Sequence, residues 1–244
     1  MKIIKVKDYD EMSEKAYSEL MDKISHLEHP VLGLATGSTP EGLYRHINEK
    51  YEQGKISFKD VKSFNLDEYV GLDKSDPASY YYFMETKLFN NVDISKDQVR
   101  VPNGTAQDLE KECNEYETAI KEAGGIDVQL LGIGINGHIG FNEPGTPFSS
   151  KTHVVDLEES TIQANARFFN SIDEVPTKAI SMGIDTIMKS KEIILLVSGA
   201  SKADALAKLM NGEVTEDVPA SILQNHPHVT VIADEAALSV VDGK

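Results

Sequence analysis

Short apolar runs alternate with longer segments of helical periodicity, and this alternation constrains the fold more than any other feature of the chain. Four runs, at residues 31–35, 61–66, 128–135 and 193–197, are each followed within a few residues by Gly, Asn, Asp or Ser, which is typical of buried strands. Residues 41–52 and 108–122 carry apolar side chains at helical spacing. Strands that alternate with helices predict an α/β fold with a doubly wound, mostly parallel sheet and helices on both faces.

Three further segments, residues 152–157, 179–182 and 229–233, are candidate strands and bring the expected sheet to about seven strands. No repeat or Pro/Gly-rich linker divides the chain, so we expect residues 1–244 to form a single domain. The densest Gly/Pro/Ser segment, residues 142–150, has the composition of a loop over a site.

The charge balance excludes several kinds of partner. The 244 residues include 24 Lys and Arg against 40 Asp and Glu, a formal net charge of −16. Nucleic acids and anionic membrane surfaces are bound mainly through cations, so neither is an expected partner.

The longest purely apolar run, residues 193–197, is far shorter than the roughly 20 residues that span a bilayer. The start of the chain lacks a signal peptide, and the single cysteine, Cys113, needs no oxidising compartment; we therefore expect a cytoplasmic protein.

The first strong run is followed by Thr36, Gly37, Ser38 and Thr39, and we expect Thr39 to cap a helix whose first residue is Pro40. Free N–H groups, hydroxyls and the positive end of a helix dipole suit a phosphate, although an ordinary helix cap has the same composition. The segment is not a nucleotide P-loop, because residues 43–44 are Leu-Tyr where Lys-Ser/Thr is needed.

The second run ends in adjacent carboxylates, Asp67 and Glu68. One of them can enter a cleft, where desolvation raises the pKa of a carboxyl group toward the range of a general base. The other is expected to stay in solvent. The alternative is a pair of acids at an ordinary turn or helix start.

The third run leads into a glycine-rich segment, residues 132–144. Gly132, Gly134 and Gly137 match G-x-G-x-x-G, which indicates a dinucleotide site only when a helix follows. Pro144 and Pro147 make such a helix improbable, so we do not expect nicotinamide binding.

The same segment presents Asn136, His138 and Glu143 within eight residues. A histidine beside a carboxylate is a natural pair for proton transfer, because the acid fixes the tautomer of the ring and raises its basicity. The alternative is a core histidine with its hydrogen bonds satisfied.

Two cations stand near expected strand or helix ends. Lys202 follows the run at 193–197 through a glycine turn, and Arg167 is the lone cation of a moderately apolar helical stretch. Taken singly, each is a candidate surface charge. No histidine pair has acidic or cysteine neighbours at metal-ligand spacing, so we expect no metal site. No G-x-S-x-G serine elbow occurs either.

Taken together, these motifs resemble those of the glucosamine-6-phosphate deaminase family. The matching segments are residues 34–40, 64–72, 132–144, 164–169 and 198–202, in family order across nearly the whole chain. The resemblance implies a Rossmann-like sheet, shared with 6-phosphogluconolactonase, and conversion of glucosamine 6-phosphate and water to fructose 6-phosphate and ammonia without a metal or organic cofactor.

The resemblance also implies roles for individual residues. His138 would open the sugar ring, assisted by Glu143 and by the residue at Asn136, and Asp67 would move a proton from C2 to C1. The implied phosphate-binding residues are Thr36, Gly37, Ser38, Thr39, Arg167 and Lys202.

Asn136 departs from the family pattern, because many members have aspartate there. An amide can orient His138 but adds no negative charge, so His138 is expected to be less basic in this chain. Larger, hexameric members extend well past the point at which this sequence ends, so we expect a monomer or a small homo-oligomer.

Two alternative functions remain at this point. A 6-phosphogluconolactonase-like hydrolase needs a base and a phosphate pocket but no acid over C2. A non-enzymatic sugar-phosphate sensor needs a DNA-binding module that the acidic chain does not offer.

We further expect a lid at about residues 145–170, since a Gly/Pro-rich start precedes the stretch that bears Arg167.

Overall fold

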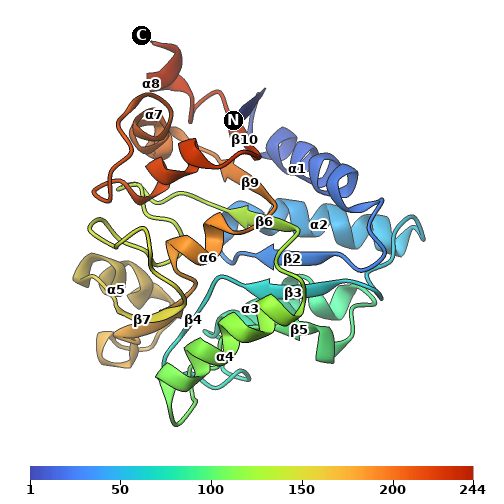
Figure 1. Cartoon of the computed structure of the whole chain (residues 1–244), viewed down its shortest axis with the longest axis vertical. Coiled ribbons are helices and arrows are strands. Elements are labelled where there is room, and N and C mark those ends of the chain that lie inside the picture. Colours follow the sequence, from blue (N-terminus) through green and yellow to red (C-terminus); the bar gives the residue numbers. More distant parts are fainter. Residues whose placement is uncertain (244) are drawn as a thin grey trace.

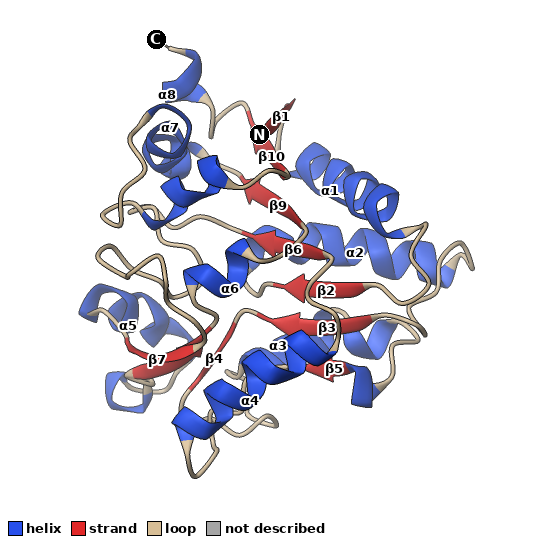
Figure 2. Cartoon of the chain, in the orientation of Figure 1, coloured by secondary structure: helices blue, strands red, loops and turns tan. Residues whose placement is uncertain are grey.

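The computed structural model describes residues 1–243 and contains a parallel seven-stranded sheet (Figures 1 and 2). Its strands lie side by side in the order β1 (Lys2–Val6), β10 (Val229–Asp234), β9 (Glu192–Val197), β6 (Val128–Leu131), β2 (Val31–Leu34), β3 (Lys62–Asn65) and β5 (Val99–Arg100). Every neighbouring pair is parallel. The expected α/β class and the sheet of about seven strands are therefore confirmed.

Helices cover both faces of this sheet, as doubly wound folds require. One face packs against α1 (Tyr9–Ile24), α2 (Ser38–Glu52) and α3 (Tyr80–Lys87). The other packs against α4 (Leu109–Glu122), α6 (Ile184–Met188) and α7 (Ala203–Asn211). The remaining helices are α5 (Glu159–Asn165), α8 (Ser239–Asp242) and the 3₁₀ turns η1 (Phe89–Asn91), η2 (Lys96–Gln98), η3 (Ala166–Phe168), η4 (Ile172–Glu174), η5 (Ala200–Lys202) and η6 (Pro219–Asn225).

The two hydrophobic cores follow from the alternation of side chains along buried strands. In β9, Ile194 and Leu196 point toward α1 and α2, whereas Ile193 and Leu195 point toward α7. Strands buried on both faces read as unbroken apolar runs, which is why the sequence revealed them so clearly.

Two of the predicted strands lie outside the main sheet. The candidates at 152–157 and 179–182 are β7 (His153–Asp156) and β8 (Lys178–Ser181), which pair antiparallel with each other in a second sheet; β8 also pairs with β4 (Asp67–Tyr69). The main sheet instead contains β1, an edge strand that is largely exposed and so lacks an apolar run, and β5, which has only two residues.

The start of α2 also differs from the expectation. The helix begins at Ser38, and Gly37 rather than Thr39 precedes its first turn; Gly37 has a φ of 93°, a conformation that favours glycine. Pro40 is therefore the third helical residue, not the first. It is tolerated there because N–H groups in the first turn have no partner within the helix.

Figure 2 shows the strands of the main sheet pointing toward the side of the molecule where β4, β7 and α5 lie. Ligands of open parallel sheets bind outside the carboxyl ends of the strands. The second sheet and α5 therefore border the place where a site is expected. Within residues 1–243, no helix combines the length and apolar character needed to cross a membrane.

Candidate active site

A cavity of about 880 Å³ opens at the carboxyl ends of β2, β6 and β9. The predicted site residues that line it are Thr36, Gly37, Ser38, Thr39, Asp67, His138, Arg167 and Lys202. They come from five separate segments of the chain. Asn136 and Glu143 do not line the cavity and instead form a hydrogen-bonded group with His138.

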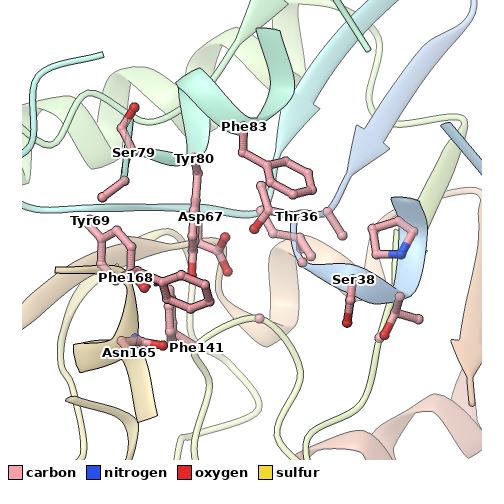
Figure 3. A pocket seen from close by; sticks show the side chains of 18 of the residues that line it. Thr36, Ser38, Asp67, Tyr69, Ser79, Tyr80, Phe83, Phe141, Asn165 and Phe168 are labelled. Carbon is pink, nitrogen blue, oxygen red and sulfur yellow. Dashed lines mark hydrogen bonds between the residues drawn. The ribbon is translucent and has the colours of Figure 1, made fainter. Parts of the chain in front are cut away.

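Asp67 is the first residue of β4, and the antiparallel pairing places it opposite Ser181 of β8. Its side chain is largely buried, and burial together with the neighbouring Glu68 charge raises the pKa of Asp67 to about 8. In Figure 3 its carboxylate lies between the aromatic rings of the cavity wall and the turn that contains Thr36 and Ser38. A carboxyl group of this kind accepts and returns a proton near neutral pH.

Glu68 is also buried, with 2% of its surface exposed, so the expectation that the second carboxylate stays in solvent is wrong. Successive side chains of a strand point to opposite sides, so Glu68 turns away from Asp67. It accepts the N–H groups of Tyr69, Tyr80 and Tyr81 at 2.8, 3.0 and 3.0 Å. The two adjacent acids therefore have different environments.

His138 is oriented by an ordered chain of hydrogen bonds. The Asn136 amide donates from Nδ2 to Glu143 Oε2 at 2.7 Å, and a carboxylate can only accept, so the amide oxygen faces the ring. Asn136 Oδ1 lies 2.7 Å from His138 Nδ1, which must then carry the proton. Nε2 is left with its lone pair, and the ring lines the cavity.

Burial and two charged groups set the basicity of His138. Burial lowers its pKa, Glu143 raises it from 3.6 Å, and the charge of Lys202 lowers it further. The net effect is a lowered pKa, so the ring is neutral at pH 7. Gly134 provides the space for the ring, since a Cβ at that position would lie 2.1 Å from the imidazole.

The cavity lining also includes two cations, Lys202 and Arg167, and turns that present N–H groups. Gly37 and Gly199 share a positive φ, 93° and 95°, at the starts of α2 and of the η5–α7 helical segment. Lys202 is half-buried there, and burial lowers its pKa. Within residues 1–243 neither Lys202 nor Arg167 forms an ion pair. These groups can hold an anion.

Asp234, at the end of β10, fixes the turn before Lys202. It accepts a hydrogen bond from Ser198 Oγ at 2.5 Å and the N–H groups of Gly199 and Ala237, the latter at 2.8 Å. Asp234 was not predicted as a site residue, because nothing local distinguishes it from other acids that end a strand.

The second sheet fixes the loop of His138 relative to Asp67. Ser181, opposite Asp67 in β8, accepts the N–H of Phe141 at 3.1 Å. The fully buried Asn142 donates from its side chain to the carbonyls of Ile139 and Met182 at 2.9 and 2.8 Å. These contacts hold Asp67 and His138 at the same cavity, although they lie 71 positions apart in the sequence.

The aromatic wall of the cavity was not predicted. Tyr69 lies 4.7 Å from Tyr80 and 6.2 Å from Phe141, measured between ring centroids, and the Tyr80 and Phe141 rings are nearly parallel at 5°. Figure 3 shows these rings, with Phe168, gathered around the Asp67 carboxylate. Their apolar surface removes water from that carboxylate. The Tyr-rich start of α3 was the available signal.

No group of three or more His, Cys, Asp or Glu side chains among residues 1–243 is arranged to hold a metal ion. The lack of a metal or organic cofactor in the reaction stays a prediction.

A buried carboxylate, a neutral imidazole and two cations around one cavity define the class of this protein: an α/β enzyme with an acid–base site. Residues 7–232 match the family of glucosamine-6-phosphate isomerases and 6-phosphogluconolactonases, and the chain belongs to that family.

Similar proteins narrow the relationship within the family. The chain is 61% identical to a glucosamine-6-phosphate deaminase of Oceanobacillus iheyensis, covering 98% of this chain and 95% of the relative. It is 58% identical to a glucosamine-6-phosphate deaminase of Shouchella clausii, covering 100% and 99%.

Solved structures show the same order of similarity. A monomeric glucosamine-6-phosphate deaminase superposes with a TM-score of 0.95 at 50% identity, covering 98% of this chain and all of that one. A 6-phosphogluconolactonase from Trypanosoma cruzi has a TM-score of 0.78 at 20% identity, covering 98% and 96%. The lactonase shares the fold, and the deaminase is the closer of the two.

Proposed function

We propose that the protein is a glucosamine-6-phosphate deaminase, which converts D-glucosamine 6-phosphate and water to D-fructose 6-phosphate and ammonia. The observation that carries this proposal is the buried carboxyl group of Asp67 in the same cavity as the free Nε2 of His138. Full-length relatives named for this activity support it.

The phosphate binds at the cationic part of the cavity. Lys202 and Arg167 supply charge, and the turn at Thr36–Thr39 supplies N–H groups and hydroxyls at the start of α2. Neither cation has a carboxylate partner within residues 1–243, so both are available to a dianion. Local binding of this kind is needed because the net charge of −16 repels anions at long range.

His138 opens the sugar ring. Its Nε2 accepts the proton of the C1 hydroxyl, the bond between C1 and the ring oxygen breaks, and Nε2 returns the proton to the ring oxygen, giving the open-chain aldehyde. Asn136 and Glu143 keep Nδ1 protonated and Nε2 free, and Glu143 stabilises the transient imidazolium from 3.6 Å.

Asp67 then transfers the proton. As a carboxylate it removes the proton from C2 and returns it to C1 through an enolamine, while a proton of the amino group passes to the C1 oxygen. The product has a hydroxyl on C1 and an imine at C2. Water adds to that imine and ammonia leaves, so one water is consumed for each ammonia released. The raised pKa of Asp67 suits both steps. The carboxylate is basic enough to remove the proton from C2, and the carboxylic acid is acidic enough to return it to C1.

A coupled assay with purified protein tests this assignment. We expect fructose 6-phosphate and ammonia in equal amounts from glucosamine 6-phosphate, and no comparable hydrolysis of 6-phosphogluconolactone. Lactone hydrolysis without ammonia release would instead support the lactonase alternative, and binding without turnover of either compound would support a sensor.

We also propose that the chain acts as a single domain, as a monomer, in the cytoplasm. A full-length structural relative is a monomeric deaminase, and the single cysteine permits no internal disulfide. Light scattering coupled to size-exclusion chromatography measures the mass in solution. A mass of 26.9 kDa supports the monomer, and a multiple of it contradicts the monomer.

A further inference from the structure

Glu68 is a buried carboxylate that the proposed reaction does not use. It is 2% exposed and accepts three backbone N–H groups: those of Tyr69 and Tyr80 on Oε1, at 2.8 and 3.0 Å, and that of Tyr81 on Oε2, at 3.0 Å. Two of these donors are the first residues of α3. Glu68 therefore binds the N-terminal turn of a helix whose ordinary cap, Ser79, already accepts the N–H of Tyr82 at 3.1 Å.

The helix start that Glu68 holds carries part of the cavity wall. The Tyr80 ring packs on Tyr69 and stacks on Phe141, and its hydroxyl lies 3.3 Å from that of Tyr69. All three aromatic residues line the cavity. Moving the first turn of α3 would therefore move the surface that keeps water from Asp67.

Glu68 also adds a negative charge next to Asp67. The other titratable groups that interact with the two carboxylates come from β4, the turn before α3, α3 and α4: Tyr69, Asp76, Tyr80 and Tyr116. His138, from the loop after β6, lines the same cavity. Burial raises the pKa of each of these tyrosines, so they are neutral at pH 7, and Asp76 acts on Glu68. Glu68 is thus the charge that contributes to the raised pKa of Asp67.

Three N–H donors favour the ionised form of Glu68. Burial raises the pKa of Glu68 above its ordinary value, and the N–H groups of Tyr80, Tyr81 and Tyr69 offset part of that rise. The positive end of the α3 dipole acts in the same direction. Two adjacent acids of one strand therefore behave differently: Glu68 is already charged when Asp67 titrates, because its charge acts on the pKa of Asp67.

We propose that Glu68 is a positioning residue of this active site, whose carboxylate joins the start of α3 to the strand that carries Asp67 and whose charge opposes the ionisation of Asp67. The inference deepens the proposed deaminase function and rests on it for the role of Asp67. In that reaction Asp67 must hold the C2 proton until C1 accepts it, and the adjacent charge makes the protonated form more stable.

Two substitutions separate the effect of the Glu68 charge on Asp67 from the effect of its side-chain length on the start of α3. Glu68→Gln keeps the length and removes the charge, so the acid limb of the kcat/KM profile moves to lower pH by about one unit. Glu68→Asp keeps the charge but shortens the side chain, which loosens α3. It should lower kcat/KM about tenfold or more and leave the midpoint of the profile near that of the wild type. Ser79→Ala, which weakens the same helix start without changing charge, is the matched control and should not move the midpoint.

A titration that does not depend on activity completes the test. Carbon-13 NMR of labelled aspartate carboxyl groups, with Asp67→Asn to assign the resonance, should show Asp67 titrating near neutral pH in the wild type and lower in Glu68→Gln. An ordinary acidic midpoint in the wild type, or equal midpoints in wild type and Glu68→Gln, overturns the inference. If Glu68→Gln does not fold, the wild-type titration and the profile of Glu68→Asp still decide it. Failure of the coupled assay with a near-neutral Asp67 would contradict the deaminase function and leave the charge effect standing.

Discussion

The Nδ1 atom of His138 lies 2.7 Å from the amide oxygen of Asn136, and the amide nitrogen of Asn136 lies 2.7 Å from Glu143. Glu143 therefore orients the Asn136 amide, and the amide in turn orients the His138 ring without adding a second negative charge beside it. This geometry leaves Nε2 as the basic atom.

Asn136→Asp should make His138 more basic. A carboxylate at Nδ1 stabilises the imidazolium, so the pKa of His138 rises, by about one unit. A smaller fraction of the enzyme then has a free Nε2 at pH 6–7, and the acid limb that reports His138 moves to higher pH. Nitrogen-15 NMR of the imidazoles measures the shift directly. Asn114→Asp on the exposed face of α4 is the matched control, and equal titration of His138 in both variants would contradict the role of the amide.

Asp67→Asn should abolish ammonia release and leave phosphate binding nearly intact. The amide fills the same space but cannot accept the C2 proton, so the loss should be about a thousandfold or more in kcat. Calorimetry with a non-reactive sugar phosphate should show an almost unchanged Kd. Turnover of glucosamine 6-phosphate near the wild-type rate by this variant would refute the assignment of Asp67.

The same substitution should stabilise the fold at alkaline pH. The folded-state pKa of Asp67, about 8, lies above the unfolded value of 3.8, so between these values the folded state binds more protons and stability falls as pH rises. The amide of the Asp67→Asn variant does not ionise. Thermal unfolding should therefore show a higher Tm for Asp67→Asn than for the wild type at pH 8–9 and a smaller difference near pH 5. Asp60→Asn, at an exposed position, should show no such pH-dependent gain.

Activity should depend on the ionisation of Asp67. The base form is the one that removes the C2 proton, so kcat/KM should decline as pH falls below about 8. The neutral fraction of His138 declines only at lower pH, because burial lowers its pKa. A profile measured from pH 5 to 9 checks this order, and a flat profile between pH 6 and 8 would contradict the raised pKa of Asp67.

Lys202→Met should weaken substrate binding more than it slows chemistry. A charge-assisted contact to phosphate is worth about 1.5–3 kcal/mol, so KM should rise about ten- to a hundredfold, with a smaller change in kcat. Lys208→Met, on the exposed face of α7, the helix that directly follows Lys202, is the control for charge and helix content. Equal KM values for the two variants would remove Lys202 from the phosphate site.

The lid stays a prediction, and the structure limits where it can be. Residues 153–156 of the expected segment form β7, which pairs with β8, so a moving part would comprise α5 and η3 at residues 159–168. Hydrogen exchange should show added protection there when a substrate analogue binds, with α4 as the unaffected reference. No added protection in residues 159–168 would argue against a lid.

The sequence by itself determined the α/β class and the segments that end at the site. Apolar runs buried on both faces, as in β9, are local signals, and so are the glycine turns and chemically distinctive residues that follow them. Because parallel strands present their carboxyl ends at one edge, the segments that follow these runs, with Asp67, His138 and Lys202, lie on one side of the sheet.

Only the tertiary structure decided what each residue faces. It placed β7 and β8 in a second sheet, buried Glu68 under α3, and brought Tyr80 and Phe141 over Asp67. These relationships depend on pairings between segments far apart in the chain, such as Asp67 opposite Ser181, which no local pattern encodes. The pKa of Asp67 is a property of that packing, because desolvation and a neighbouring charge act only once the surrounding segments have assembled.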